Sequence, residues 1–261
     1  MTGYGVHHVS LEAATLLATN AQGNSSGRLF SDISISAQAG RSLVLLGPNG
    51  CGKTSVARAI VGLAPVSSGR RLARAGTQFA FMPQDYRHAF FPWLSIQENV
   101  ALRLRSSPSD QEDRCGTPVV GTEEMMSLAH RLDVDLDLKR YPDQVSGGQL
   151  QLVLFLTTIV MPGDVRVLDE PFSALDFRRR AIASELMSER VALTPEEAWV
   201  VVTHDIAEGV QLADEIVVLS TERNILTRVP VDLVWPRGFG VREAPAGLTA
   251  IHAVRQAVGV A

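Results

Sequence analysis

Residues 47–55 have the composition and spacing of a phosphate-binding loop, because they fit the pattern G-x-x-x-x-G-K-[ST]. Glycines let the backbone curl so that successive N–H groups point at an anion, and the helix expected next adds its own unpaired N–H groups. The pattern brings Lys53 to the β- and γ-phosphates of a nucleotide and the Thr54 hydroxyl to Mg²⁺. An accidental match by a glycine-rich turn is expected on the order of once in a hundred such chains. The residues assigned to nucleotide binding are Gly47, Pro48, Asn49, Gly50, Cys51, Gly52, Lys53, Thr54 and Ser55.

Two adjacent carboxylates, Asp169 and Glu170, follow a mostly apolar run at residues 165–168 that is typical of a buried strand. Asp169 suits the coordination of Mg²⁺. Glu170 suits a general base, or a group that orients water for attack on a γ-phosphate. The alternative is that the pair only caps a helix at the end of the strand.

Gln84 and His204 also follow predicted strands and are two further candidates for catalysis. The Gln84 amide can contact both the metal and the attacking water, and the His204 imidazole can hydrogen-bond a γ-phosphate. Taken singly, a loop glutamine is more often only solvated, and a histidine at a strand end is more often structural.

A second candidate anion site precedes the apolar helix expected at residues 149–160. Ser146, Gly147 and Gly148 place a hydroxyl and two glycines at the helix N-terminus, where unpaired N–H groups attract anions. One chain then has two half-sites for a single triphosphate, an arrangement that is completed when two copies meet head to tail. The alternative is an ordinary Ser-Gly-Gly helix start.

Strands alternating with helices surround these residues, and this order predicts an α/β fold. The mostly apolar runs at residues 41–46, 165–168 and 198–202 each end just before a candidate ligand, and open α/β sheets bind ligands at the carboxyl ends of their strands. Nearer the start of the chain, we expect an edge strand at residues 9–18 and a loop at residues 65–69.

Capping patterns predict where two further helices begin. Ser95 followed by Glu98 is a capping box, and Asp205 precedes a short run with helical spacing. Residues 215–220 and 224–229 are strand candidates that can pair as a hairpin.

Composition narrows the class of protein. The 261 residues are 46% hydrophobic, enough for a buried core, and the net charge of −4 gives no basic field, so no nucleic-acid partner is expected. No apolar run approaches the ~18–20 residues that cross a bilayer, and the first residues lack the pattern of a secretory signal. Cys51 and Cys115 have no metal-ligand spacing and no expected disulfide, which indicates a reduced, cytosolic chain.

The motifs together resemble those of the ATP-binding subunit of an ABC transporter, over nearly the whole chain. The resemblance rests on the phosphate-binding loop, Gln84, the stretch Val145-Ser-Gly-Gly-Gln149, Asp169-Glu170, the stretch Phe172-Ser-Ala-Leu-Asp176 and His204. It implies a P-loop NTPase (RecA-like) core with an antiparallel β subdomain and an inserted α-helical subdomain. It also implies one ABC-type ATP-binding domain over residues 1–261, divided into a core with β subdomain at 1–86 and 163–235, a helical subdomain at 87–162 and a C-terminal extension at 236–261.

The same resemblance implies an Mg²⁺-dependent ATPase that couples ATP binding and hydrolysis to solute transport. In the implied dimer with a second copy, Ser146, Gly147, Gly148 and Gln149 contact ATP held by the partner, and Asp176 belongs to a loop linking the two sites. The subunit is expected on the cytoplasmic side of the cell membrane, bound peripherally to transmembrane permease subunits. A solute-binding protein is an indirect partner.

The stretch Phe90-Phe-Pro-Trp-Leu94 is similar to a segment of the nitrate, sulfonate and taurine branch of bacterial importers. This resemblance implies import of a small anion and contact with the permease near Phe91 and Trp93, which have the amphipathic character of interface anchors. The alternative is that both side chains only pack the helical subdomain.

Three departures from the family pattern stand out. No aromatic residue that could stack on adenine occurs around residues 19–22, and the signature begins with Val145 where leucine is common. The helix after Gln149 carries apolar residues or threonine over residues 150–158, where the family usually has arginines. The ion pairs that usually brace this helix are therefore expected to be missing or rebuilt.

Two other functions stay open from the sequence. A degenerate or regulatory nucleotide-binding subunit would clamp ATP without hydrolysing it, and the altered helix after Gln149 is compatible with that role; a measurement of ATP turnover separates it from an active subunit. A non-transport ABC ATPase acting on DNA or ribosomes usually carries coiled-coil inserts or two tandem units, and neither is found here.

Overall fold

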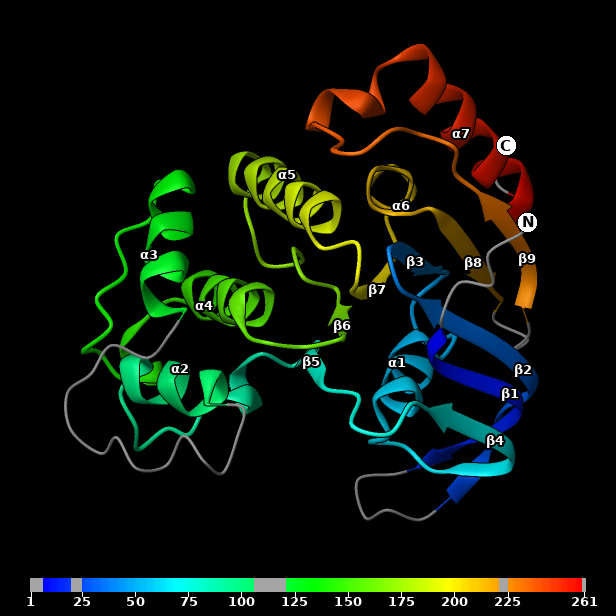
Figure 1. Cartoon of the computed structure of the whole chain (residues 1–261), viewed down its shortest axis with the longest axis horizontal. Coiled ribbons are helices and arrows are strands. Elements are labelled where there is room, and N and C mark those ends of the chain that lie inside the picture. The colour runs from blue at the N-terminus through cyan, green and yellow to red at the C-terminus, as the bar shows by residue number, and fades with distance from the viewer. Residues whose placement is uncertain (1–6, 20–24, 106–120, 221–224, 260–261) are drawn as a thin grey trace.

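The computed structural model describes residues 7–19, 25–105, 121–220 and 225–259, whose helices and strands are arranged around two sheets (Figure 1). The strands are β1 (His7–Thr19), β2 (Ser25–Gln38), β3 (Arg41–Leu46), β4 (Val66–Ala73), β5 (Phe79–Met82), β6 (Val165–Asp169), β7 (Ala198–Thr203), β8 (Glu215–Leu219) and β9 (Ile225–Pro230). The α-helices are α1 (Lys53–Val61), α2 (Ile96–Leu104), α3 (Thr122–Arg131), α4 (Gly147–Val160), α5 (Phe177–Leu193), α6 (Ile206–Leu212) and α7 (Pro245–Val258). Short 3₁₀ turns occupy Arg87–Ala89, Pro142–Gln144 and Phe239–Arg242. Residues 20–22 and Cys115, which entered the expectations above, lie outside the described residues.

The larger sheet has six strands in the order β5-β6-β7-β3-β8-β9. Its first five strands run parallel, and β9 returns antiparallel to β8, as the expected hairpin requires. Strands β6 and β7 are buried along their whole length, which fits the mostly apolar sequences of both strands. Pairing of Leu46 with Thr203 and of Asp169 with Val202 brings the carboxyl ends of β3, β6 and β7 to one edge.

The smaller sheet is antiparallel, in the order β2-β1-β4, and corrects two expectations. Strand β1 lies in the middle of this sheet rather than at its edge, because β4 pairs with its free side from Leu16↔Val66 to Val9↔Ala73. Residues 66–69 of the expected loop therefore belong to a strand. The sequence does not reveal this strand because most of β4 is exposed. Its serines face solvent, and apolar residues do not alternate along it.

Helices cover both faces of the larger sheet, and the two faces have separate cores. Helix α1 packs between the two sheets, against residues such as Leu43 and Leu45 of β3 and Val9 of β1. Helices α4, α5 and α6 pack on the opposite face, against Val44 and Leu46. Figure 1 shows α2, α3 and α4 grouped beyond the β5 edge, and α7 lying over α6 and β9. None of the described helices is long and apolar enough to span a bilayer.

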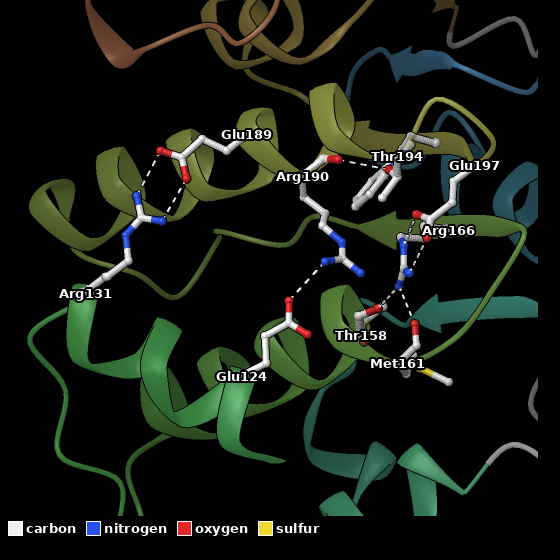
Figure 2. Close-up of polar contacts among 10 residues, drawn as sticks. Glu124, Arg131, Thr158, Met161, Arg166, Glu189, Arg190, Thr194 and Glu197 are labelled. Carbon is white, nitrogen blue, oxygen red and sulfur yellow. Dashed lines mark hydrogen bonds and ion pairs between the residues drawn. The ribbon is translucent and has the colours of Figure 1, made fainter. Parts of the chain in front are cut away.

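The brace of helix α4 is rebuilt with residues from elsewhere in the chain (Figure 2). Helix α4 is buried from Leu150 to Val160 and has no basic residue in its last turn. Arg166 of β6 supplies the missing cation by donating to the carbonyls of Thr158 (2.6 Å) and Met161 (2.8 Å). Its guanidinium also donates twice to Glu197, at 2.5 and 2.7 Å. One buried ion pair therefore contacts the C-terminal end of α4, a helix without the arginines that are usual in the family.

Two further ion pairs join α3 to α5 on the same side of the molecule. Arg131 donates to both carboxylate oxygens of Glu189, at 2.8 and 2.9 Å, and Arg190 donates to Glu124 at 3.0 Å. These pairs lie near the surface, where a single ion pair contributes about 0–1 kcal/mol. Figure 2 shows them beside the buried pair of Arg166 and Glu197.

Candidate active site

The phosphate-binding loop leaves the carboxyl end of β3 and enters α1. Gly50 and Gly52 have φ of +80° and +104°, values that favour glycine, and a Cβ on Gly47 would lie 2.5 Å from the carbonyl oxygen of Leu219. Lys53 is buried, and its ammonium donates to the carbonyls of Gly47 (2.8 Å) and Pro48 (3.0 Å). The lysine is thereby held across the loop, where it can meet a phosphate anion. Cys51 is buried in the same loop as a free thiol.

Three oxygen-bearing side chains meet beside this loop. The Thr54 hydroxyl donates to Oε1 of Gln84 at 3.3 Å. Asp169 is completely buried, and neither of its carboxylate oxygens has a hydrogen-bond partner. Burial raises the pKa of Asp169 to about 6, opposed by the nearby Thr54 hydroxyl and the Lys53 charge.

These residues fit Mg²⁺. A buried carboxylate without a partner is costly, and a divalent cation removes that cost. The hydroxyl, amide and carboxylate oxygens of Thr54, Gln84 and Asp169 are the hard ligands that Mg²⁺ prefers. Within the described residues, no group of three or more His, Cys, Asp and Glu side chains forms another metal site.

Glu170 and His204 form the second half of the site. Nδ1 of His204 lies 3.2 Å from Oε1 of Glu170, and the Glu170 side chain is mostly buried while His204 is half exposed. Glu170 has φ of +50°, an uncommon conformation for a residue with a side chain. A cavity of about 20 Å³ is lined by Glu170, His204 and Glu208, and this volume admits one water molecule.

The signature residues lie apart from this cluster in the same chain. The Ser146 hydroxyl accepts from the N–H of Gln149 (3.2 Å), and Oε1 of Gln149 accepts from the N–H of Ser146 (3.0 Å), so the two residues cap α4 reciprocally. Asp176 caps α5 by accepting from the N–H of Arg179 at 2.9 Å. Because α4 and α1 pack on opposite faces of the sheet, these residues are not brought to the phosphate-binding loop of their own chain.

The sequence model of the ABC transporter family matches residues 30–173, more than half of the chain. The chain belongs to the ABC transporter family. The uncharacterized ABC transporter ATP-binding protein YtlC of Bacillus subtilis is 32% identical over 233 residues, 85% of either chain. The aliphatic sulfonates import ATP-binding protein SsuB of that organism is 29% identical over 80% of either chain. The sulfate/thiosulfate import ATP-binding protein CysA of Burkholderia mallei is 35% identical over 74% of this chain and 56% of its own.

Solved structures agree with the fold expected of an ABC transporter cassette. The ATP binding subunit of an ABC transporter superposes with a TM-score of 0.71 at 18% identity, over 95% of this chain and 99% of that chain. A dimeric bacterial ABC transporter cassette gives 0.68 at 19% identity, over 87% and 100%. The P-loop NTPase fold is confirmed. As an ABC transporter cassette, the chain is an ATPase that uses ATP and Mg²⁺.

One polar residue of the ABC cassette site escaped the sequence argument. Gln151 of α4 is completely buried and hydrogen-bonds the segment that follows Glu170. A signal was present, since Gln151 is a polar residue flanked by Leu150 and Leu152 in a largely apolar helix. The sequence gives no indication of which residues the amide contacts, because they lie 19 to 23 positions later.

The aromatic segment of this ABC cassette is exposed and well supported. Phe91 and Trp93 are 44% and 69% exposed, and their ring centroids are 5.3 Å apart. The buried Asn99 holds the segment by accepting from the N–H of Phe91 (2.8 Å) and donating to the carbonyls of Phe91 (3.1 Å), Leu94 (3.0 Å) and Ser95 (3.0 Å). The two rings are therefore presented to solvent on a fixed turn.

Proposed function

We propose that this chain is the ATP-hydrolysing subunit of an importer, and that its catalytic machinery is the cluster at the carboxyl ends of β3, β5, β6 and β7. The observation that carries the proposal is the convergence of Lys53, the Thr54–Gln84 contact, the unpartnered Asp169 and the Glu170–His204 contact. Six side chains from four strand ends meet the chemical needs of one triphosphate.

In this proposal the backbone of residues 47–55 binds the phosphates, and Lys53 offsets their negative charge. Thr54, Gln84 and Asp169 hold Mg²⁺, which offsets charge on the β- and γ-phosphates when bound. Glu170 orients the attacking water and accepts its proton, and its partly buried position keeps competing water away. His204 donates a hydrogen bond to the γ-phosphate and helps to fix the Glu170 carboxylate at 3.2 Å.

A second copy completes the proposed site. Ser146, Gly147, Gly148 and Gln149 bind the ATP held by the partner, and Asp176 lies in the loop between the two sites. The separation of α4 from the phosphate-binding loop supports this arrangement, since one chain does not use both anion sites on one ATP. A structural neighbour is itself described as dimeric, which agrees with the proposal.

We also propose that transmembrane permease subunits dock at Phe91 and Trp93. This contact would hold the chain on the cytoplasmic face of the membrane. A solute-binding protein is proposed to serve the same importer. The exposure of both rings on the turn held by Asn99 supports this contact. The proposed solute is a small anion such as nitrate, a sulfonate or taurine. The support for an anion is the segment at residues 90–94, since the relatives include proteins named for sulfonates and sulfate but also for spermidine/putrescine and maltose. The proposed subdomains are those that the resemblance implies: a core with β subdomain at 1–86 and 163–235, a helical subdomain at 87–162 and a C-terminal extension at 236–261.

Phosphate release by the purified chain tests this function. We expect turnover with ATP and Mg²⁺, none with EDTA, and a loss of at least 100-fold in Glu170→Gln, within the range of a general base. The matched control is Glu243→Gln, the same change at an exposed residue outside the cluster, which should leave turnover within twofold. Equal turnover in both variants would remove Glu170 from the catalytic role. No turnover by the wild type, even with its permease, would refute the ATP-hydrolysing function.

A further inference from the structure

We propose that Gln151 is a positioning residue through which helix α4 holds the catalytic loop, an inference that rests on the proposed role of Glu170. Gln151 lies in the second turn of α4, and none of its surface is exposed. Its Nε2 donates to the carbonyl of Glu170 (3.1 Å) and to Oγ of Ser173 (2.9 Å), and its Oε1 accepts from the N–H of Ala174 (2.7 Å). One side-chain amide therefore fixes three points of a five-residue segment.

The hydrogen bond from Gln151 matters because the backbone of Glu170 has an unfavourable conformation, which it would leave if this bond were lost. Its φ is +50°, where a Cβ is crowded. The N–H of Glu170 is held by the carbonyl of Val202 at 3.0 Å, and its own carbonyl is held by Gln151. With one side fixed by β7 and the other by α4, the side chain is directed to His204. Without Gln151, the carbonyl side is free to turn, and the carboxylate moves with it.

The same amide joins the two proposed nucleotide contacts of one chain. Helix α4 begins with Gly147 and Gly148, which are proposed to meet the partner's ATP, and Gln151 follows about one turn later. Ala174, held by Gln151, lies two residues before Asp176, which caps α5. Gln151 therefore links two parts of the chain: helix α4, which is proposed to contact the partner's ATP, and the catalytic loop of the chain's own site.

The positioning role predicts a separation of turnover from ATP binding. Gln151→Met keeps the length of the side chain and removes all three hydrogen bonds. We expect its kcat to fall about 30-fold, since a displaced base loses much of its catalytic advantage. Its KM and Kd for ATP should stay within twofold, because residues 47–55 are untouched. The matched control Thr157→Val removes a buried hydroxyl of the same helix that bonds the carbonyl of Val153, and it should keep kcat within twofold.

A second readout is independent of turnover. Amide hydrogen exchange in the segment from Glu170 to Asp176 should be at least tenfold faster in Gln151→Met and unchanged in Thr157→Val. In the double variant Gln151→Met/Glu170→Gln, kcat should equal that of Glu170→Gln alone, because the amide acts through Glu170.

Several results would overturn the proposal: wild-type kcat in Gln151→Met, a parallel loss of kcat and ATP affinity, an additive loss in the double variant, or unchanged amide exchange. Should Gln151→Met fail to fold, Gln151→Glu decides, since it keeps the acceptor for Ala174 N–H but loses both amide donors; wild-type kcat and exchange in that variant overturn the inference. If the wild type has no turnover, the proposed function fails, and the exchange result still decides whether Gln151 fixes the loop.

Discussion

Removal of Glu197 tests the rebuilt brace of helix α4. The guanidinium of Arg166 is 1% exposed and makes two hydrogen bonds to Glu197 and two to the carbonyls of Thr158 and Met161. Glu197→Ala leaves a buried cation without its counter-charge. Such a loss costs about 3–5 kcal/mol, and the two remaining carbonyl bonds point to the lower end, about 3 kcal/mol.

Urea denaturation at 25 °C measures this loss, and a thermal melt should show a Tm lower by about 6–12 °C for a chain of this size. The matched control is Glu189→Ala, which breaks the pair with Arg131 at the surface, where both partners are nearly half exposed. It should cost no more than about 1 kcal/mol.

A second comparison separates lost charge from lost packing. The double variant Arg166→Met/Glu197→Leu removes both charges together, and it should recover most of the stability lost in Glu197→Ala. A cost below about 1 kcal/mol for Glu197→Ala, or an equal cost for Glu189→Ala, would show that Glu197 is not the stabilising counter-charge of Arg166.

Three further predictions concern pH and partners. Burial raises the pKa of Asp169 to about 6, so a proton competes with Mg²⁺ below that pH; the Mg²⁺ concentration for half-maximal turnover should rise about tenfold from pH 7 to pH 5. Burial raises the pKa of Glu208 to about 7, so the folded protein holds a proton that the unfolded chain loses above pH 4.5, and stability falls as the pH rises to 7. In urea denaturation, the free energy of unfolding should fall between pH 5 and pH 8 by roughly 2 kcal/mol less in Glu208→Gln than in the wild type. The same pH dependence in both proteins contradicts the role assigned to Glu208. Trp93→Ala should leave turnover of the isolated chain within twofold but reduce co-purification of permease subunits, and undiminished co-purification excludes Trp93 from that contact.

The sequence predicted those elements whose residues interact locally. Strand β3 has the predicted bounds, Arg41–Leu46, and helix α1 (Lys53–Val61) follows the loop as predicted, because a buried parallel strand and a glycine-rich loop leave clear patterns. Helices α2 and α6 begin after Ser95 and Asp205 as predicted, because their caps are encoded within three residues. The candidate residues after the strands converge because parallel strands end at one edge.

Interactions between distant residues could not be predicted in the same way. The exposed strand β4 has no alternation of apolar residues, so the central place of β1 was missed. Nothing local indicates that Arg166 pairs with Glu197, or that Gln151 holds Ser173 and Ala174, since both contacts depend on how separate elements pack. The resemblance indicated only that a brace for α4 was needed.

One chain is proposed to provide only half of each ATP-binding site, and the mass of Glu170→Gln in ATP and Mg²⁺ tests whether a second copy joins it. This variant should bind ATP without hydrolysing it, and light scattering after gel filtration should then give about twice the chain mass of 28.2 kDa. The same variant without nucleotide should give one chain mass. A single chain mass with ATP bound would exclude the proposed dimer, because the site would then hold ATP without a second copy.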